Sequence, residues 1–560
     1  MWAIENPGAS PRPAPEGDPP GKTPAILLLG WLALLLPWAW LVRRFWFVTD
    51  DAYISFRYAR NLASGLGLRY NPGEHPPVEG YSDFLWVILC SLFERLRLDI
   101  ETAPLILSAA CGALLLFLVF RLLLFRFRMH PLPAFLGALS LAAAPSFALW
   151  STGGLETIPF ALLLFLAAER MLLRRTGSAP LAGAIPGLAA ALMRTEGIFW
   201  AAGIGVLAWM LGGGEGRMNR RAALRYFAVV LAGYAVYFAA RYAYYGEPLA
   251  NTAYVKAGLG GAVFLRGARY VASYFLAFLV PFFIVPGFFA ARRRAGGKTA
   301  LALAALAAAN IAYAVAVGGD WMAMGRILLP ALIVPGAILI AFLLDAVRDG
   351  GGARRSAAAA LLGGAIVAMG VLPAFNIHAF PRSFLAKLDF RYHASAFRTE
   401  REQWEQMVLT KSIWKFFGKQ LKEIAAPGES CACGAIGAIG YYSGLYVYDT
   451  NGLVTPAVAK GESAAEARSP GHDKHVPLTF FMDEKPTYLL HVTPMTSNVA
   501  LSMIRRWRGG PYGRDYVAAS IPLTQERGAP PTALLYFRRI RPEEDPGEAW
   551  RLFLDGFSAR

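Results

Sequence analysis

Long apolar runs are the feature that most constrains this chain. Hydrophobic residues make up 56% of its 560 residues and charged residues only 17%, and the hydrophobic ones come in runs rather than amphipathic stripes. A helix of about 20 apolar residues crosses a bilayer, and rather fewer suffice inside a bundle. The predicted fold class is therefore a polytopic α-helical membrane protein with about eleven spans. These cover residues 25–48, 103–125, 132–150, 156–173, 180–194, 197–212, 222–245, 268–290, 299–317, 327–347 and 356–373. The spans 180–194 and 197–212 could instead merge or re-enter the membrane.

Short basic clusters separate these runs and set the expected orientation. Cytoplasmic loops of membrane proteins are enriched in Lys and Arg, and with the N-terminus inside, every cluster falls on the cytoplasmic side. The first loop, 49–98, and everything after Pro373 then lie outside. Because the net charge of +17 is divided among these clusters, nucleic acid is not an expected partner. The clusters are Arg126 and Arg128, Arg174 and Arg175, Arg217 with Arg220 and Arg221, Arg292 to Arg294 with Lys298, and Arg348 with Arg354 and Arg355.

Composition divides the chain into three parts. Residues 1–24 are rich in Pro, Gly and Ala and are expected to form a disordered cytoplasmic tail. Residues 25–374 form the predicted transmembrane module. From 375 to 560 the apolar runs shorten and turn residues become frequent, which predicts an extracytoplasmic soluble domain of mixed α/β structure. An amphipathic helix is expected at 399–425 and strands at 445–448, 488–491 and 533–537.

Acidic residues gather at the outer ends of the predicted spans. An ionisable group near the membrane is costly and is therefore a functional candidate by default. Their position on one side indicates a polar cavity at the outer leaflet. These acids are Asp50, Asp51, Glu79, Asp83, Glu156, Glu196, Glu247 and Asp320.

The first outer loop carries the strongest signal. Asp50 and Asp51 stand where the first span leaves the lipid, and an amphipathic helix with Arg57 and Arg60 follows. Transfer of a sugar to a hydroxyl needs a carboxylate that takes the acceptor proton and cationic groups that stabilise a departing phosphate. The acid pair suits the first task and the arginines the second. The alternative is that an acid of the pair only caps the helix.

This loop resembles that of a known enzyme superfamily. Residues 49–62, together with 78–86, are similar to the first outer loop of the GT-C glycosyltransferases, integral membrane enzymes that use polyprenyl-phosphate sugars. Within that superfamily the pattern is most similar to the mycobacterial terminal arabinofuranosyltransferases and their bacterial relatives. Further stretches that fit are 251–256, 318–322 with Arg326, 437–443 with Asp449, and 471–474.

The resemblance implies an inverting glycosyltransferase with an aspartate general base, Asp50 or Asp51. It implies transfer of arabinofuranose, or of a hexose such as mannose, from a polyprenyl-phosphate donor to a hydroxyl of a glycan, lipid or protein acceptor. It places the active site and the C-terminal domain on the periplasmic side of a bacterial inner membrane.

Eleven further residues are predicted to bind the donor or substrate. We expect Glu79, Lys256 and Asp320 to meet Asp51 in one cavity, although each could instead form an interfacial ion pair. Glu156 could instead begin a helix, and Arg194 could pair with Glu196. The full set is Arg57, Glu79, Tyr81, Glu156, Arg194, Glu196, Asn251, Tyr254, Lys256, Asp320 and Arg326.

Metal and cofactor signals are weak. His472 and His475 have a spacing that occurs in metal sites, but no third ligand accompanies them, so zinc is not predicted. The sequence leaves open whether a divalent cation is held by Asp50, Asp51 or Asp320.

Two other functions remain as alternatives. One is a transporter or flippase for a lipid-linked sugar, which would not need an acid pair on one side or a large outer domain. The other is an outer-leaflet oligosaccharide ligase or polymerase, whose key basic residues tend to lie in a late loop.

Overall fold

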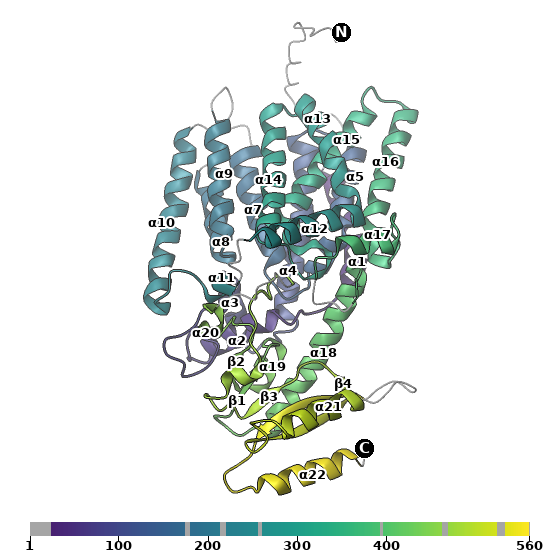
Figure 1. Cartoon of the computed structure of the whole chain (residues 1–560). Coiled ribbons are helices and arrows are strands. Elements are labelled where there is room, and N and C mark those ends of the chain that lie inside the picture. Colours follow the sequence, from purple (N-terminus) through teal and green to yellow (C-terminus); the bar gives the residue numbers. More distant parts are fainter. Residues whose placement is uncertain are drawn as a thin grey trace.

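The protein consists of a bundle of apolar helices with an α/β domain at one end (Figure 1). The computed structural model describes residues 24–173, 180–212, 220–255, 260–391, 396–461, 469–523 and 532–558. The predicted tail, 1–24, therefore lies outside the described residues except for Pro24. The helices of the bundle are α1 (Pro24–Arg44), α4 (Ala103–Arg121), α5 (Pro131–Ala142), α6 (Pro145–Trp150), α7 (Thr157–Ala168), α8 (Pro180–Met193), α9 (Gly197–Leu211), α10 (Arg220–Tyr245), α13 (Ile284–Arg294), α14 (Gly297–Ala316), α15 (Val334–Arg348) and α16 (Ala353–Val371).

The polytopic helical membrane fold is confirmed, but the number of full-length spans is lower than eleven. Among the described residues, six helical segments are long and apolar enough to cross a membrane, or seven if one bent pair counts as a span. The ranges predicted at 132–150, 180–194 and 197–212 contain apolar helices of only 10–17 residues. In Figure 1 these shorter helices stand beside longer ones. The sequence prediction counted them as full spans because it rested on hydropathy alone.

The span predicted at 268–290 is not one continuous helix. Helix α12 (Gly261–Phe278) ends at Leu279, whose φ of 57° is left-handed, and Pro281 follows. Proline has no backbone N–H to donate to a helix, so the next helix begins in a new direction. The two helices meet at 87°, and Figure 1 shows α12 lying across the bundle while α13 runs along it.

The α/β domain is built on one mixed sheet. Its main strand order is β2-β1-β3-β6-β4, and β5 also pairs with β6. Strand β1 is parallel to β2 and β3, whereas β6 is antiparallel to its three partners. The predicted mixed α/β structure is thus confirmed. The strands are β1 (Ser430–Cys433), β2 (Tyr446–Asp449), β3 (Tyr488–Leu490), β4 (Met495–Thr496), β5 (Tyr516–Leu523) and β6 (Thr532–Arg539).

Helices cover this sheet and connect it to the bundle. The longest, α18, is the amphipathic helix expected from the sequence. Its start is fixed by a capping box between Thr399 and Glu402. The helices after the bundle are α17 (Arg382–Leu385), α18 (Glu400–Ile424), α19 (Ala438–Ser443), α20 (Pro456–Ala459), α21 (Ser497–Arg508) and α22 (Pro546–Ser558).

Three short helices lie between the bundle and the α/β domain. They are α2 (Ala52–Ala63), α3 (Phe84–Arg95) and α11 (Asn251–Val255). Helix α2 packs against both α3 and α19. The acid pair of the first loop precedes α2, so it lies at the junction of the two parts.

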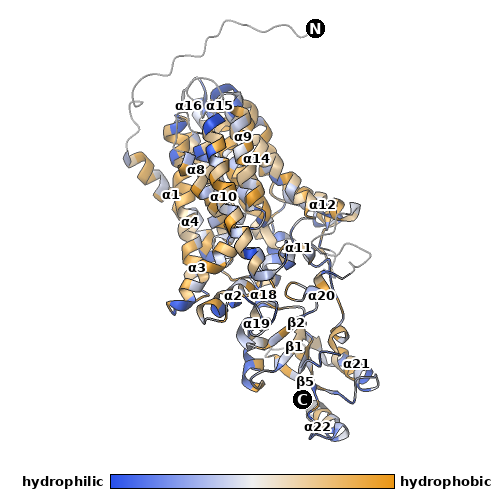
Figure 2. Ribbon diagram, turned by 90° about the vertical axis from the view of Figure 1, so that its left-hand side faces the viewer, coloured by the Kyte–Doolittle hydropathy of each residue, from blue (hydrophilic) through white to orange (hydrophobic). Residues whose placement is uncertain are grey.

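The opposite end of the bundle is basic. Three arginines end α13, and Arg294 pairs with Asp345 at 2.5 Å and Asp349 at 2.9 Å. Figure 2 shows hydrophilic residues at this end, near α15 and α16, and a largely hydrophobic stretch between it and the junction. This end of the bundle thus carries a cluster of arginines at the end of α13.

Candidate active site

A polar cavity of about 80 Å³ lies at the junction. It brings together five of the predicted site residues, each from a different stretch of chain. They are Asp51 before α2, Tyr81 before α3, Glu156 before α7, Arg194 between α8 and α9, and Arg326 before α15.

The two aspartates of the pair face different surroundings. The Asp50 carboxylate is buried and accepts a 2.8 Å hydrogen bond from the Ala438 backbone N–H of the α/β domain. Burial raises the pKa of Asp50 to about 7. Gly437 packs so closely that a Cβ there would lie 2.5 Å from an Asp50 carboxylate oxygen. Asp50 thus links the first outer loop to the α/β domain.

Asp51 instead lines the cavity. It occupies the N-cap position of α2, yet its side chain makes no capping hydrogen bond to the helix. The alternative that this acid is a simple helix cap is therefore not supported for Asp51. Of the pair, Asp51 is the one placed to meet a ligand in the cavity.

Two guanidinium groups reach the same cavity. Arg194 is hydrogen-bonded to Glu156 and donates from Nε to Glu196 at 2.5 Å. Arg326 donates from Nε to Asp320 at 2.7 Å. The carboxylates fix the arginines in place, and a guanidinium carries five N–H groups, more than these bonds use. The remaining N–H groups can donate to a ligand in the cavity.

Asp83 belongs to this cavity although it was not among the predicted site residues. Its Oδ2 accepts a 2.8 Å hydrogen bond from the Ser55 hydroxyl. Burial raises the pKa of Asp83, and the nearby Glu156 carboxylate raises it further. Asp83 stands two residues after Tyr81 in the stretch 78–86, and this position was the signal in the sequence that could have identified it as a site residue. Thr252 and Leu453 also line the cavity, and nothing in their residue types marked them.

Glu79, Asn251 and Tyr254 line a second, larger cavity. Glu79 accepts a 2.7 Å hydrogen bond from Arg241 Nε, and the Asn251 amide donates to the carbonyls of Gly452 and Leu453. The expectation that Glu79 shares a cavity with Asp51 is therefore wrong. Residues 73–79 line this second cavity, whereas residues 80–83 line the Asp51 cavity, so the boundary between the two cavities falls between Glu79 and Gly80.

Two other predicted residues contribute differently or cannot be placed. Asp320 does not line the Asp51 cavity itself but holds Arg326, which does. Lys256 lies outside the described residues.

The structure also corrects the expected role of Arg57 as a donor-phosphate ligand. Its buried guanidinium donates to the carbonyls of Tyr70 at 2.9 Å, Gly440 at 2.7 Å and Leu445 at 2.6 Å. It also lies 4.1 Å from the centre of the Tyr70 ring. The side chain points into the α/β domain and does not line the Asp51 cavity.

His472 and His475, whose spacing occurs in metal sites, each contact another side chain. His472 packs edge-on against Trp321, and His475 Nδ1 lies 3.0 Å from the Asn451 side-chain oxygen. Within the described parts of the chain, no three His, Cys, Asp or Glu residues are grouped so that they could hold a metal ion.

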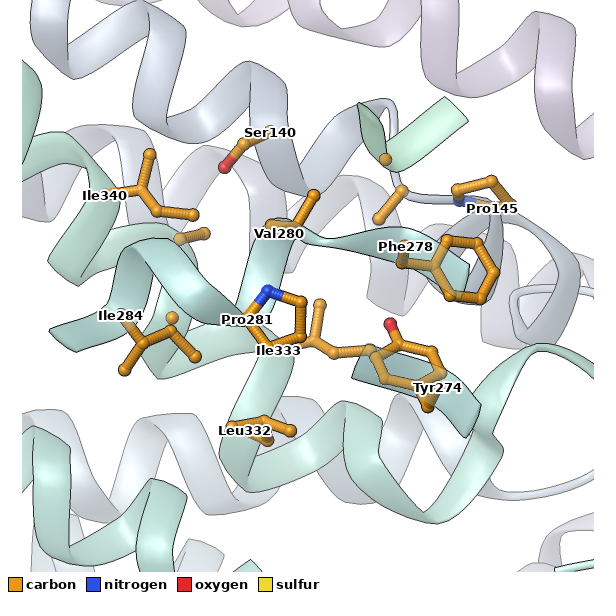
Figure 3. Close-up of a pocket in the computed structure, with 14 residues that line it drawn as sticks. Ser140, Pro145, Tyr274, Phe278, Val280, Pro281, Ile284, Leu332, Ile333 and Ile340 are labelled. Atoms are coloured by element: carbon orange, nitrogen blue, oxygen red, sulfur yellow. The ribbon is translucent and has the colours of Figure 1, made fainter. Parts of the chain in front are cut away.

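An apolar pocket lies in the bundle at the α12–α13 bend (Figure 3). Figure 3 shows the rings of Tyr274 and Phe278 on one side of Pro281 and the side chains of Ile284 and Ile340 on the other. Two stretches of chain contribute residues both to this pocket and to the polar cavity. One runs from Pro145 to Glu156 and the other from Arg326 to Leu332, each with one end in either site.

Comparison with known proteins supports the fold. A family model described as a domain of unknown function, DUF8728, matches residues 396–536, which lie in the α/β domain. None of the curated proteins searched is a significant match.

Solved structures match over nearly the whole chain. ArnT from Cupriavidus metallidurans, bound to undecaprenyl phosphate, aligns with 92% of this chain over 98% of its own, at 14% identity and a TM-score of 0.54. Archaeal oligosaccharyltransferase AglB from Archaeoglobus fulgidus aligns with 93% of this chain over 74% of its own, at 11% identity and a TM-score of 0.49. Arabinofuranosyltransferase AftD from Mycobacteria aligns with 94% over 40% of its own chain, at 14% identity and a TM-score of 0.48. At these identities the likeness concerns the fold alone, which this chain shares with ArnT.

Proposed function

We propose that this protein is an inverting glycosyltransferase that uses a polyprenyl-phosphate sugar and has Asp51 as its general base. The observation that carries the proposal is the meeting of Asp51 with Arg194 and Arg326 in one polar cavity at the end of an apolar bundle. A carboxylate beside two fixed guanidiniums suits a reaction that takes a proton and releases a phosphate.

In the proposed reaction, the acceptor hydroxyl attacks the anomeric carbon of the donor sugar while Asp51 takes its proton. The bond between that carbon and the phosphate oxygen breaks, and its electron pair leaves with the polyprenyl phosphate. Arg194 and Arg326 stabilise the negative charge that develops on the phosphate. Because attack and departure occur on opposite faces of the sugar, its anomeric configuration inverts.

The donor lipid would lie with its phosphate in the polar cavity and its prenyl chain toward the apolar pocket at the α12–α13 bend. That pocket is lined mainly by aliphatic and aromatic side chains, and the chain segments 145–156 and 326–332 each contribute residues to it and to the Asp51 cavity. The transferred sugar would be arabinofuranose or a hexose such as mannose.

The proposed orientation places the Asp51 cavity and the α/β domain on the periplasmic side of a bacterial inner membrane. The arginine-rich end of the bundle would face the cytoplasm, as the asymmetry of basic loops favours.

The proposal is tested with purified full-length protein supplied with polyprenyl-phosphoryl arabinofuranose or polyprenyl-phosphoryl mannose and a mixture of glycan acceptors. We expect one donor to release polyprenyl phosphate and to give a product of inverted anomeric configuration by NMR. A phosphonate analogue, in which a carbon replaces the scissile oxygen, should release nothing. Movement of intact donor across proteoliposome membranes without phosphate release would instead identify a flippase.

A further inference from the structure

The second cavity lies between the membrane module and the α/β domain. One wall is the loop 73–79, another runs from Tyr245 to Tyr254, and the α/β domain contributes Tyr446, Pro456 and Lys460. Its volume is about 590 Å³, compared with about 80 Å³ for the Asp51 cavity. That size is within the roughly 300–1,000 Å³ of ordinary ligand pockets.

A buried acceptor atom in this cavity lacks a partner. Glu79 is only 3% exposed, and one of its carboxylate oxygens is held by Arg241, while the other has no hydrogen-bond partner. A buried polar atom without a partner is costly. One oxygen of Glu74 is likewise buried and unpartnered. Glu74 and Glu79 both line the cavity, so a ligand rich in hydroxyl donors bound there would lie beside these two carboxyl groups.

Aromatic rings line the same space. Tyr245, Tyr254 and Tyr446 contribute their side chains. Tyrosine offers an apolar face together with a polar hydroxyl, and such faces pack against the C–H faces of sugar rings. Rings combined with carboxylate acceptors suit a carbohydrate better than a lipid chain, which needs no acceptors.

The charges of the cavity favour a neutral ligand. Lys460 lines the cavity and pairs with Glu247 at 2.6 Å, and Arg241, which is not part of the lining, pairs with Glu79. His75 also lines the cavity. The remaining acid is Glu74, and burial raises its pKa to about 7. An anionic ligand would meet three carboxylates, and a cationic one would find only a partly ionised acid.

A thin wall separates this cavity from Asp51. Gly80 lines the Asp51 cavity, while its neighbour Glu79 lines the other. A Cβ at Gly80 would lie 2.5 Å from the Val454 side chain and 2.8 Å from the Leu453 carbonyl, so glycine is needed for the wall to pack against the α/β domain. The second cavity is thus adjacent to the Asp51 cavity at this point of the chain.

We propose that the second cavity binds a neutral, hydroxyl-rich glycan, which supplies sugar residues of the acceptor other than the one that reacts. The identification of this glycan as part of the acceptor rests on the proposed transferase function. The binding of a glycan, however, is measurable without any turnover.

The test is direct binding of defined oligosaccharides to full-length protein in detergent, measured by saturation-transfer NMR and calorimetry. The probes are an arabinofuranose pentasaccharide, mannotriose and, as an anionic comparison, a galacturonate trisaccharide. We expect at least one neutral probe to bind and the galacturonate to bind at least tenfold more weakly.

Two substitutions in the cavity and one matched control complete the test. Glu74→Gln and Tyr254→Ala should each weaken binding of the neutral probe at least tenfold, whereas Glu543→Gln, at an exposed site of the α/β domain, should not. Thermal unfolding of each variant shows whether it is folded, and Glu74→Gln is isosteric. The proposal would be overturned if both cavity variants bound the neutral probe as tightly as the wild type does. It would also be overturned if neither neutral probe bound, or if the galacturonate bound as tightly as the neutral probes.

The outcomes for glycan binding and for the transferase are separable. Release of polyprenyl phosphate without binding of these glycans in the cavity would overturn the glycan site alone. Binding that depends on Glu74 and Tyr254, with no release from any donor, would retain the glycan site and contradict the transferase.

Discussion

At the scale of single residues, the junction gives similar side chains different tasks. Asp50 is turned into the α/β domain and Asp51 into the polar cavity. The Arg57 guanidinium donates hydrogen bonds to backbone carbonyls, whereas Arg194 and Arg326 pair with carboxylates at the cavity. Chemistry at this site therefore depends on which direction each side chain takes from its short helix or turn.

Arg57 should matter for stability rather than for donor affinity. Arg57→Ala would remove the donor that three carbonyls share at the junction. A buried polar group left unsatisfied costs about 1–3 kcal/mol, so we expect a loss of about 3 kcal/mol or more. Thermal unfolding and limited proteolysis of the purified protein measure it.

The matched control for this substitution is Arg43→Ala, at an exposed arginine near the end of α1. It should leave the unfolding midpoint nearly unchanged. If Arg57→Ala were as stable as the wild type and only raised KM for the donor, Arg57 would act on the phosphate after all.

Sequence reasoning found many site residues because charged groups at span ends are conspicuous. It could not separate Asp50 from Asp51, since the partner of Asp50 is Ala438, 388 positions away. It also placed Glu79 with Asp51, because the side to which each residue of an extended segment points depends on the packing around it. Asp83 was noticed as an outer acid, but its burial beside Glu156 is visible only in three dimensions.

At the scale of elements, hydropathy located the helices but not their breaks. Helix α18 was predicted to within about one residue at each end, because its apolar residues recur at helical spacing. The bend after α12 was not predicted, because a left-handed Leu279 leaves no mark in a hydropathy average. The apolar pocket at this bend was missed for the same reason.

The turn 151–156 shapes the Asp51 cavity by packing on the start of α2. The Thr49 N–H donates to the Gly153 carbonyl at 3.1 Å. Gly154 has a φ of 81°, and a Cβ there would lie 2.8 Å from the Ala52 Cβ, next to Asp51. The close approach of these two segments requires glycine.

Gly154→Ala should therefore disturb the position of Asp51. We expect turnover to fall about 10- to 100-fold, because small misplacements of a catalytic group are costly. Steady-state release of polyprenyl phosphate measures this.

Gly65→Ala is the matched control for that experiment. Gly65 has a similar φ of 78°, but nothing lies within 4 Å of a Cβ built there. It should carry only the backbone strain, about 1–2 kcal/mol, with turnover retained. Equal turnover by both variants would show that the contact with Ala52 does not position Asp51.

At the scale of the whole molecule, the fold places a polar junction at one end of an apolar bundle and arginines at the other (Figures 1 and 2). The polytopic fold and the α/β domain were both predictable, because long apolar runs and their sudden end after residue 375 are properties of composition. The number of full-length spans was not, since three of the predicted ranges contain apolar helices of only 10–17 residues.

The proposed orientation can be measured with single cysteines in a variant that lacks the four native ones. Glu484→Cys lies on the exposed surface of the α/β domain, and Arg354→Cys is exposed at the basic end. In intact cells, a membrane-impermeant thiol reagent should label the first site, and the second only after permeabilisation. The reverse pattern would place the Asp51 cavity in the cytoplasm.

The role of Asp51 as general base is tested most directly by comparing Asp51→Asn with Asp50→Asn in purified protein. Asp51→Asn should lower turnover about 10²- to 10⁴-fold, the usual contribution of a general base, with donor affinity nearly intact. Asp50→Asn should retain most activity, because its side-chain oxygen can still accept from the Ala438 N–H. Near wild-type turnover by Asp51→Asn would contradict the assignment of Asp51 as the base.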